Sequence, residues 1–222
     1  VHLLEEIDKF HDKGLIRVRF TSPHPQDMSD QLIEAMGKLK THLPYLHLPI
    51  QSGDNRTLKR MNRSYTVEDY KEKIEKIRAA VPDISISTDV IVGFCGETDE
   101  EFENTYNLFK EMEFEHAYLA QYSERTGTTA ARFIKDDIPK EVKHKRWHRL
   151  NDLLRENSKK ALDRFVGKTV NVLVENQDDK TCTGRSEHFK TVEFESGRNL
   201  LGQIVPVKIA ESREWMLKGE LA

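Results

Sequence analysis

The sequence predicts an α/β domain that forms part of a parallel (β/α) barrel, followed by a small all-β barrel. Strand and helix patterns alternate through about the first 130 residues, which is typical of parallel sheets with crossover helices. From Gly167 onward the apolar residues recur at every second position in short runs, which favours a small β-barrel. We expect about four strands in the first part, too few for a closed eight-stranded barrel but enough for a section of one.

Composition and cysteine count narrow the class of protein. The chain has 222 residues with a net charge of -3, and 33% of them are charged and 37% hydrophobic, as expected of a soluble protein. Its two cysteines, Cys95 and Cys182, exclude a disulfide framework and any zinc or iron–sulfur site ligated wholly by this chain's cysteines. No apolar stretch approaches about 18 residues and no signal peptide is seen, so we expect a cytoplasmic protein without a membrane segment. The helical pattern starts at Val1, from which we expect that an N-terminal portion is missing.

The first elements follow from apolar spacing and turn residues. His2–Lys13 has apolar residues at helical spacing, and Gly14 ends this helix. Ile16–Phe20 alternates apolar residues with arginines, which indicates a strand. Ser29–Lys40 opens on an N-cap serine and has one apolar face, which predicts a helix. The short apolar run Tyr45–Ile50 predicts the end of a second strand.

The next elements carry clearer signals. Thr66 caps a helix that runs to about Ala80, with Asp69 as a weak capping-box partner. Ile84–Val92 ends in a continuous β-branched run, which is typical of a strand buried on both faces. A second capping box opens a helix at Thr98, and Ala117–Tyr122 follows it as one more strand.

A long basic helix separates the two predicted domains. Pro139–Phe165 has one apolar face, and residues 135–164 hold ten Lys and Arg against six Asp and Glu. We therefore expect a barrel domain at residues 1–164, with the basic connecting helix at 139–164, and an all-β domain at residues 165–222.

Three predicted strand ends carry polar residues that could converge on one pocket. The glycine-rich turn Gly93–Glu97 lies between a buried strand and a capped helix, where backbone can approach a ligand and N–H groups can receive an anion. His47–Gly53 and Thr21–Pro25 follow two other strands in the same way. The alternative is that the glycines only shape a βα loop and that His47 is a hydrogen-bonded structural residue.

Three runs of sequence together resemble one known family. They are HLPIQSGDNRTLKRMNRSYT at residues 47–66, PDISISTDVIVGFCGETDEEFENT at 82–105 and YSERTGTTAA at 122–131. In this order they are similar to the radical S-adenosylmethionine (SAM) methylthiotransferases. The end of the chain, from GKTVNVLVE to LKGEL, is similar to the TRAM domain that closes those proteins. The pairing of HLP-x-QSG with MNR-x-YT favours the branch that acts on N6-dimethylallyladenosine.

The resemblance implies a fold and an activity. The fold is the C-terminal part of a radical SAM partial TIM-like (β/α) barrel, followed by an OB-like TRAM barrel that binds RNA. The activity is methylthiolation of carbon 2 of an N6-modified adenosine next to the anticodon of tRNA. In the family, two 4Fe–4S clusters and SAM carry this chemistry: one cluster binds SAM, which yields a 5′-deoxyadenosyl radical, and the other supplies sulfur. The implied partner is the tRNA anticodon arm, no membrane is involved, and we expect the full-length enzyme to act as a monomer.

The resemblance also implies site residues, by strand-end position. Those expected to bind the SAM cofactor are Thr21, Ser22, His47, Gln51, Asp89, Ile91, Val92 and Gly93. Those expected to bind the substrate or RNA are Glu97, Lys143, Arg146, Lys168, Arg185, Phe189, Lys190 and Arg198. For the basic helix the alternative is an ordinary solvated face.

The chain departs from the family in two ways. The family's three N-terminal cysteines and its Cys-x3-Cys-x2-Cys loop do not occur here, so we expect the cluster ligands upstream, no catalytic or metal-binding residue in this chain, and no activity from it alone. Cys95 stands where the family usually has proline, and we interpret it, like Cys182, as a small apolar residue.

Other hypotheses remain open at this point. The chain could be a cluster-free RNA-binding protein, a methylthiotransferase acting on threonylcarbamoyl-adenosine in tRNA, or a small-molecule enzyme with an ordinary barrel pocket. The last would need a catalytic pair, and the separation of Asp89 and Glu97 cannot be read from the sequence. Because an incomplete barrel exposes sheet edges, we expect the isolated chain to aggregate or to pair with a neighbour.

Overall fold

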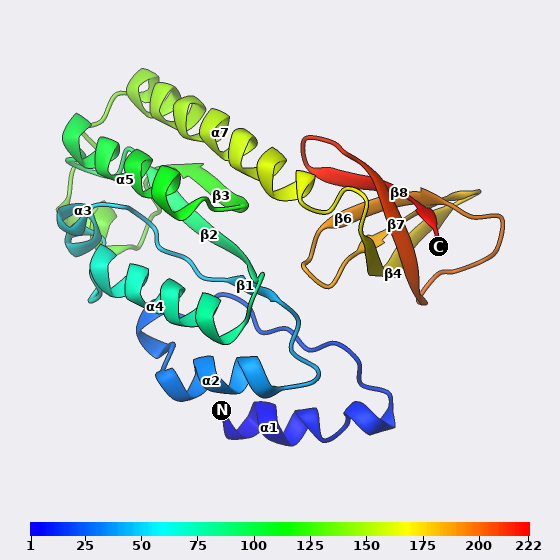
Figure 1. The fold of residues 1–222 in the computed structure, drawn as a ribbon. Helices are drawn as coiled ribbons and strands as arrows, with labels where there is room; N and C mark the ends of the chain where they lie inside the picture. Colours follow the sequence, from blue (N-terminus) through cyan, green and yellow to red (C-terminus); the bar gives the residue numbers. More distant parts are fainter. The chain divides into compact units, whose positions relative to one another are not determined.

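The computed structural model describes residues 1–222 as two compact units. The first comprises residues 1–42 and 46–154, and the second comprises residues 43–45 and 155–222. The α/β elements belong to the first unit and a β-barrel belongs to the second (Figure 1).

The first unit opens with short helical segments in place of a long helix and a strand. Helix α1 (His2–Asp8) is followed by a 3-10 turn, η1 (His11–Lys13), which Gly14 ends in the left-handed region with φ +99°. The predicted strand Ile16–Phe20 is wrong, because this segment forms only one isolated bridge, from Val18 to His42. Alternation alone does not make a strand where no neighbouring strand continues the pairing.

A three-stranded sheet forms the centre of the first unit. Its strands are β1 (Tyr45–His47), β2 (Ser85–Val92) and β3 (His116–Gln121), in the order β1-β2-β3. β2 and β3 are parallel, with Asp89 opposite Tyr118, as the βα rhythm predicts. The expected number of strands was one too high because the first one does not form.

Further helices precede, connect and follow these strands. They are η2 (Pro25–Asp27), α2 (Asp30–Lys38), α3 (Asn55–Arg60), α4 (Val67–Ala80), α5 (Asp99–Met112) and α6 (Thr129–Phe133). Ser29 caps α2, and complete capping boxes at Thr66 and Thr98 open α4 and α5, which confirms these three predictions. The sequence did not predict α3 or α6, which are too short to show a periodic apolar face.

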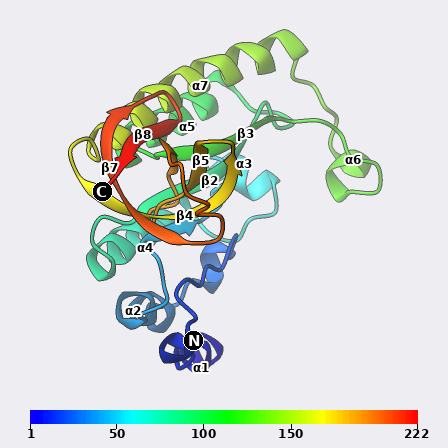
Figure 2. The ribbon, with the colours of Figure 1, turned by 90° about the vertical axis from the view of Figure 1, so that its right-hand side faces the viewer.

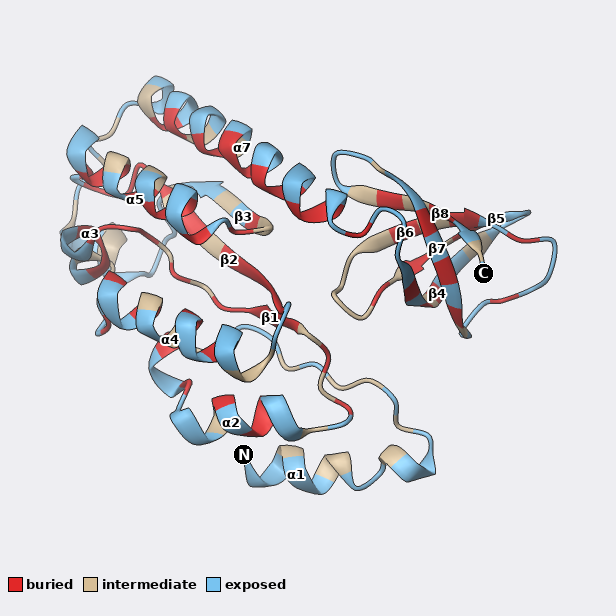
Figure 3. Cartoon of the chain, in the orientation of Figure 1, coloured by how far each residue is buried: buried red, intermediate tan, exposed pale blue.

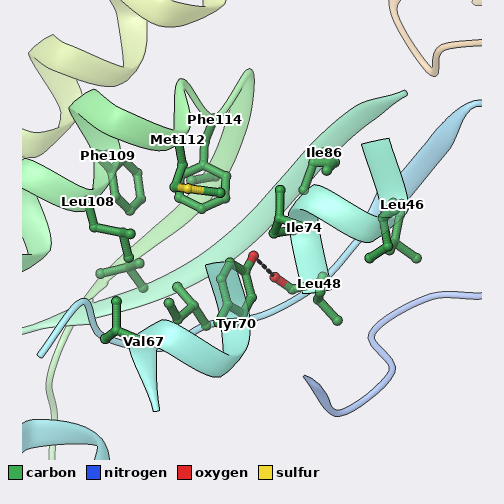
Figure 4. Packing of buried hydrophobic residues seen from close by; sticks show 14 of the residues in the cluster. Leu46, Leu48, Val67, Tyr70, Ile74, Ile86, Leu108, Phe109, Met112 and Phe114 are labelled. Carbon is green, nitrogen blue, oxygen red and sulfur yellow. Dashed lines mark hydrogen bonds between the residues drawn. The ribbon is translucent and has the colours of Figure 1, made fainter. Parts of the chain in front are cut away.

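Buried residues of the helices and of β2 form the core of the first unit (Figure 3, red), and their apolar side chains pack together (Figure 4). Tyr70, Phe109 and Phe114 are among its largest fully buried side chains. The Tyr70 hydroxyl also donates a hydrogen bond of 2.8 Å to the Leu48 carbonyl, which satisfies a buried acceptor beside β1. Helix α7 (Lys140–Asp163) contributes Leu150 and its apolar neighbours to the same core.

The second unit contains a closed five-stranded barrel, which confirms the predicted all-β fold (Figure 2). Its strands are β4 (Thr169–Asp178), β5 (Thr181–Arg185), β6 (Thr191–Glu195), β7 (Ile204–Ser212) and β8 (Met216–Leu221), in the order β4-β5-β6-β8-β7. β6 and β8 are parallel, and the other pairs are antiparallel. Alternate residues such as Val172, Phe194 and Val207 point inward and are fully buried.

None of the helices combines the length and the apolar character needed to pass through a bilayer.

Removing Phe109 should unfold the first unit more easily. Phe109→Ala leaves a cavity in the core, which we expect to lower the free energy of unfolding by about 3–5 kcal/mol. The measurement is urea unfolding followed by circular dichroism. Phe133, whose side chain is 80% exposed, is the matched control, and Phe133→Ala should change stability by less than about 0.5 kcal/mol. Equal effects of the two substitutions would contradict this packing.

Candidate functional site

An open pocket of about 570 Å³ lies at the carboxyl ends of β2 and β3. This is the edge of a parallel sheet at which α/β proteins bind ligands. The walls come from the strand ends, from the segment after β1 and from the segment that leads into α6. The lining residues are Gln51, Arg63, Asp89, Val90, Ile91, Phe94, Tyr118, Ala120, Gln121, Tyr122, Ser123, Arg125, Thr128 and Ala130.

The structure brings together some of the residues predicted to bind a cofactor. Gln51, Asp89 and Ile91 line the pocket. The strand continues from Ile91 into Val92 and Gly93, which are buried. Thr21 and Ser22 do not line this pocket; both are exposed, on the segment before η2.

A chain of polar contacts connects His47 with the pocket through Asp89. The Nδ1 atom of His47 lies 2.8 Å from the Ser87 hydroxyl oxygen, and its Nε2 atom lies 3.2 Å from Oδ1 of Asp89. His47 is buried, whereas the Asp89 side chain is half-buried and faces the pocket. The rings of Tyr118 and His47 form a T-shaped pair with centroids 5.5 Å apart. His47 therefore contacts Asp89 rather than the pocket itself, and holds the orientation of a carboxylate that can accept hydrogen bonds from ligand hydroxyls.

Gln51 has a strained backbone at the rim of the pocket. Its φ is +76°, which is uncommon for a residue with a side chain. Two parallel-bridge hydrogen bonds hold it there: its N–H donates to the Asp89 carbonyl at 2.8 Å, and the Ile91 N–H donates to its carbonyl at 3.0 Å. Strain of this kind persists only where the surroundings fix it, and it is concentrated at functional sites.

The turn between β2 and α5 is held by a buried carboxylate. Gly93 and Gly96 have φ values of +68° and +72°, which glycine adopts without steric cost. The Glu97 Oε2 atom accepts hydrogen bonds from the Gly93 N–H and from Nη1 of Arg146, both at 2.7 Å. Burial raises the pKa of Glu97, and these two hydrogen bonds oppose part of that rise.

The residues Glu97, Lys143 and Arg146, which are predicted to bind substrate or RNA, are buried in ion pairs of the first unit. The side chains of Arg146 and Glu97 are only 7% and 1% exposed, and that of Lys143 is 5% exposed. The Lys143 ammonium lies 2.7 Å from both carboxylate oxygens of Asp136. A cation that is already paired and desolvated is not available to a phosphate.

Two arginines that the site prediction did not name face the pocket. Arg63 and Arg125 line it, and neither forms an ion pair in the structure. They belong to the runs MNRSYT and YSERTGTTAA that carry the family resemblance, which was the available signal. Tyr118, which is 58% exposed on β3, also lines the pocket and was also absent from the predicted site. The pocket thus combines unpaired guanidinium groups, a carboxylate, an amide and apolar strand residues, a set suited to an anionic ligand with hydroxyl groups and an aromatic ring.

The predicted RNA contacts of the second unit lie on its strands and loops. Lys168 is exposed directly before β4, and Arg198 is exposed in the connection between β6 and β7. Arg185 ends β5, and its guanidinium carbon lies 4.6 Å from the centre of the Phe189 ring. Phe189 and Lys190 belong to the connection between β5 and β6, where Phe189 has φ +60°.

The two cysteines are structural in their surroundings. Cys95 and Cys182 are both free and fully buried, in agreement with their interpretation as small apolar residues. No group of three or more His, Cys, Asp or Glu side chains is placed to hold a metal ion.

Comparison with known proteins gives matches to both units. Residues 1–109 match the Radical SAM superfamily, and residues 163–222 match the TRAM domain. The tRNA-2-methylthio-N(6)-dimethylallyladenosine synthase of Geobacillus kaustophilus is 44% identical over 99% of this chain and 41% of that protein. The enzyme of the same name from Acetivibrio thermocellus is 44% identical over 99% of this chain and 46% of that protein. The chain thus spans less than half the length of these relatives.

Among solved structures, the fold is similar to that of coproporphyrinogen III oxidase from Escherichia coli, a radical SAM enzyme. The TM-score is 0.50 at 14% identity, and the match covers 86% of this chain and 46% of that one. At this identity the similarity concerns the fold alone.

Removing the Glu97 carboxylate should destabilise the first unit strongly. Glu97→Ala leaves the Arg146 guanidinium buried without its inner partner, which we expect to cost about 3–5 kcal/mol of unfolding free energy. Asp99, the other partner of Arg146, is the matched control, because its side chain is 95% exposed. Asp99→Ala should cost about 1 kcal/mol or less. Urea unfolding measures both, and a small effect of Glu97→Ala would refute the buried pair.

Proposed function

Because the chain belongs to the radical SAM methylthiotransferase family, we propose that it is part of an enzyme that methylthiolates carbon 2 of an N6-modified adenosine next to the anticodon of tRNA. The observation that carries this proposal is the similarity along nearly the whole chain to enzymes named for that reaction. The relatives carry dimethylallyladenosine in their names, so we propose this adenosine rather than the threonylcarbamoyl form as the substrate.

The pocket at the ends of β2 and β3 fits SAM. Its volume of about 570 Å³ lies within the range of cofactor pockets. Asp89 can accept hydrogen bonds from ribose hydroxyls, the unpaired Arg63 guanidinium can bind the methionyl carboxylate, and Gln51 offers an amide beside them. Ile91 and Ala120 provide an apolar wall for the adenine, next to the backbone of Val92 and Gly93.

When bound, SAM supplies the radical and methyl chemistry of the family's reaction. The chain's own residues bind and orient the cofactor and exclude water from it. His47 acts here through Asp89, whose carboxylate it holds in place. Thr21 and Ser22, which lie outside the pocket, have no part in this proposal.

The iron–sulfur clusters of the family do not fit the residues of this chain. Its two cysteines are buried in different units, and no other group of side chains is placed to hold a metal ion.

We place the RNA contacts in the second unit, which matches the TRAM domain. Single-stranded loop bases are bound by stacking and edge contacts, with Lys and Arg on the phosphates. Lys168, Arg185, Phe189, Lys190 and Arg198 supply these groups on the barrel. The domain boundary near residue 165 is part of the same proposal, and the TRAM match beginning at residue 163 supports it.

Loss of the Asp89 or Arg63 charge should weaken SAM binding. In the full-length enzyme, Asp89→Asn and Arg63→Met each remove a charge-assisted hydrogen bond, which should raise the Kd for SAM by about tenfold or more. Equilibrium dialysis with radiolabelled SAM measures the Kd. Asp179→Asn is the control, because Asp179 is exposed in the second unit at φ +50°, where asparagine is well tolerated. Wild-type affinity in both pocket variants would sink the assignment of this pocket.

Arg198 should contribute to tRNA binding through phosphate. We expect Arg198→Ala to weaken binding of an anticodon stem-loop and to reduce the slope of log K against log salt by about one unit. Fluorescence anisotropy at several salt concentrations gives both numbers. Lys180, exposed at the turn between β4 and β5, is the control, and Lys180→Ala should leave the slope unchanged. A slope unaltered by Arg198→Ala would remove Arg198 from the interface.

A further inference from the structure

Helix α7 inserts two buried cations between the loops that form the pocket walls. Lys143 and Arg146 are three residues apart on this helix and therefore lie on one face. We propose that Lys143 and Arg146, together called the cation clamp, are positioning residues that fix the two strand-exit loops around the SAM pocket. This inference rests on the proposed function, because it concerns the geometry of that same pocket.

Arg146 fixes the loop that leaves β2. Its Nη1 group donates to the Glu97 carboxylate at 2.7 Å and to the Glu97 carbonyl at 3.1 Å. The same carboxylate oxygen accepts the Gly93 N–H. The Arg146 guanidinium thus fixes Glu97, the last residue of the turn, directly. It fixes Gly93, the first residue of the turn, through the Glu97 carboxylate. Phe94, which lines the pocket, lies within this turn.

Lys143 fixes the loop that leaves β3. Its ammonium donates to the Tyr122 carbonyl at 3.1 Å and to both Asp136 carboxylate oxygens at 2.7 Å. Tyr122 and Asp136 are the two ends of the segment that carries Arg125, Thr128 and the other loop residues of the pocket. A single buried charge therefore ties this segment together at its base.

The two loops that the cation clamp contacts are also joined to each other. The Gly96 N–H of the first loop donates to Asp137 of the second at 2.7 Å. Lys143 packs so closely on Gly93 that a Cβ atom added there would lie 2.4 Å from the Lys143 Cγ atom. The rings of Phe94 and Tyr122 meet edge to face with centroids 4.9 Å apart, and both line the pocket.

The contacts of the cation clamp fix the two strand-exit loops more than they attach helix α7 to the domain. The helix has its own apolar attachment through Leu150 and its neighbours, and Trp147 donates to the Leu119 carbonyl at 2.9 Å. Buried ion pairs add little stability over apolar side chains of similar size, because desolvation offsets their attraction. The cation clamp instead donates to the backbone carbonyls of Tyr122 and Glu97. It also binds the carboxylates of Glu97 and Asp136, which order the loops.

The test uses the full-length enzyme and two variants that leave no charged partner buried alone. One is the double variant Glu97→Gln with Arg146→Met, and the other is Lys143→Met, whose partner Asp136 is 26% exposed. Lys145→Met is the matched control, because Lys145 is an exposed cation on the same helix. The readouts are the Kd for SAM, the rate of native-state trypsin cleavage at Arg125 and Arg132, and the thermal midpoint.

We expect both clamp variants to raise the Kd for SAM by about tenfold, and Lys143→Met to speed cleavage by a similar factor, since cleavage follows the opening of the segment. The thermal midpoint and the control should stay near wild type. Wild-type SAM affinity in both clamp variants overturns the inference, whatever happens to cleavage. So does a loss of affinity that only follows a fall in the thermal midpoint. If wild-type enzyme itself fails to bind SAM, the proposed function fails, and unchanged cleavage in Lys143→Met would then reject the clamp separately.

Discussion

The carboxylate of Glu97 is the group on which the geometry of the pocket depends. It is withdrawn from water and is compensated from two directions, by a backbone N–H of Gly93 and by the guanidinium of Arg146. Because a buried charge is tolerated only when its partners are in place, the turn after β2 and the helix α7 must adopt one mutual arrangement. That arrangement fixes the turn that leaves β2, and Phe94 of this turn lines the pocket.

Two neutral tyrosine hydroxyl groups fix the chain that follows β1 and leads to Gln51 in the pocket wall. Tyr65 donates to the Ile50 carbonyl at 2.9 Å, and Tyr70 donates to the Leu48 carbonyl at 2.8 Å. Burial raises the pKa of Tyr65 to about 12, so this phenol remains a donor at any physiological pH. The chain after β1 is therefore fixed up to Gln51, whose strained backbone presents its side chain at the rim.

The sequence was most informative where a local signal decides the structure. Capping residues such as Thr98 and the β-branched end of β2 could be read directly, because each acts on its immediate neighbours. The strand at Ile16–Phe20 could not be judged, since pairing depends on a partner far along the chain. The burial of Lys143 and Arg146 could not be predicted for a related reason: a charged residue on a helix gives no sign that a carboxylate from another element will meet it inside the protein. Arg63 reaches the pocket only through the fold, because its motif does not show which strand ends it will lie beside.

The β-barrel of the second unit is closed, so its sheet needs no partner from outside the domain. Each of its five strands is paired on both sides, with the parallel pair of β6 and β8 completing the circle. No row of backbone donors and acceptors is left to seek a neighbouring chain, which is the hazard that open sheets must manage. A domain that satisfies its own backbone in this way can be joined to unrelated catalytic domains through one helix, without redesign of either surface for strand pairing. The barrel is in this sense a transferable part, whose binding face can diverge while its hydrogen-bonded frame stays the same.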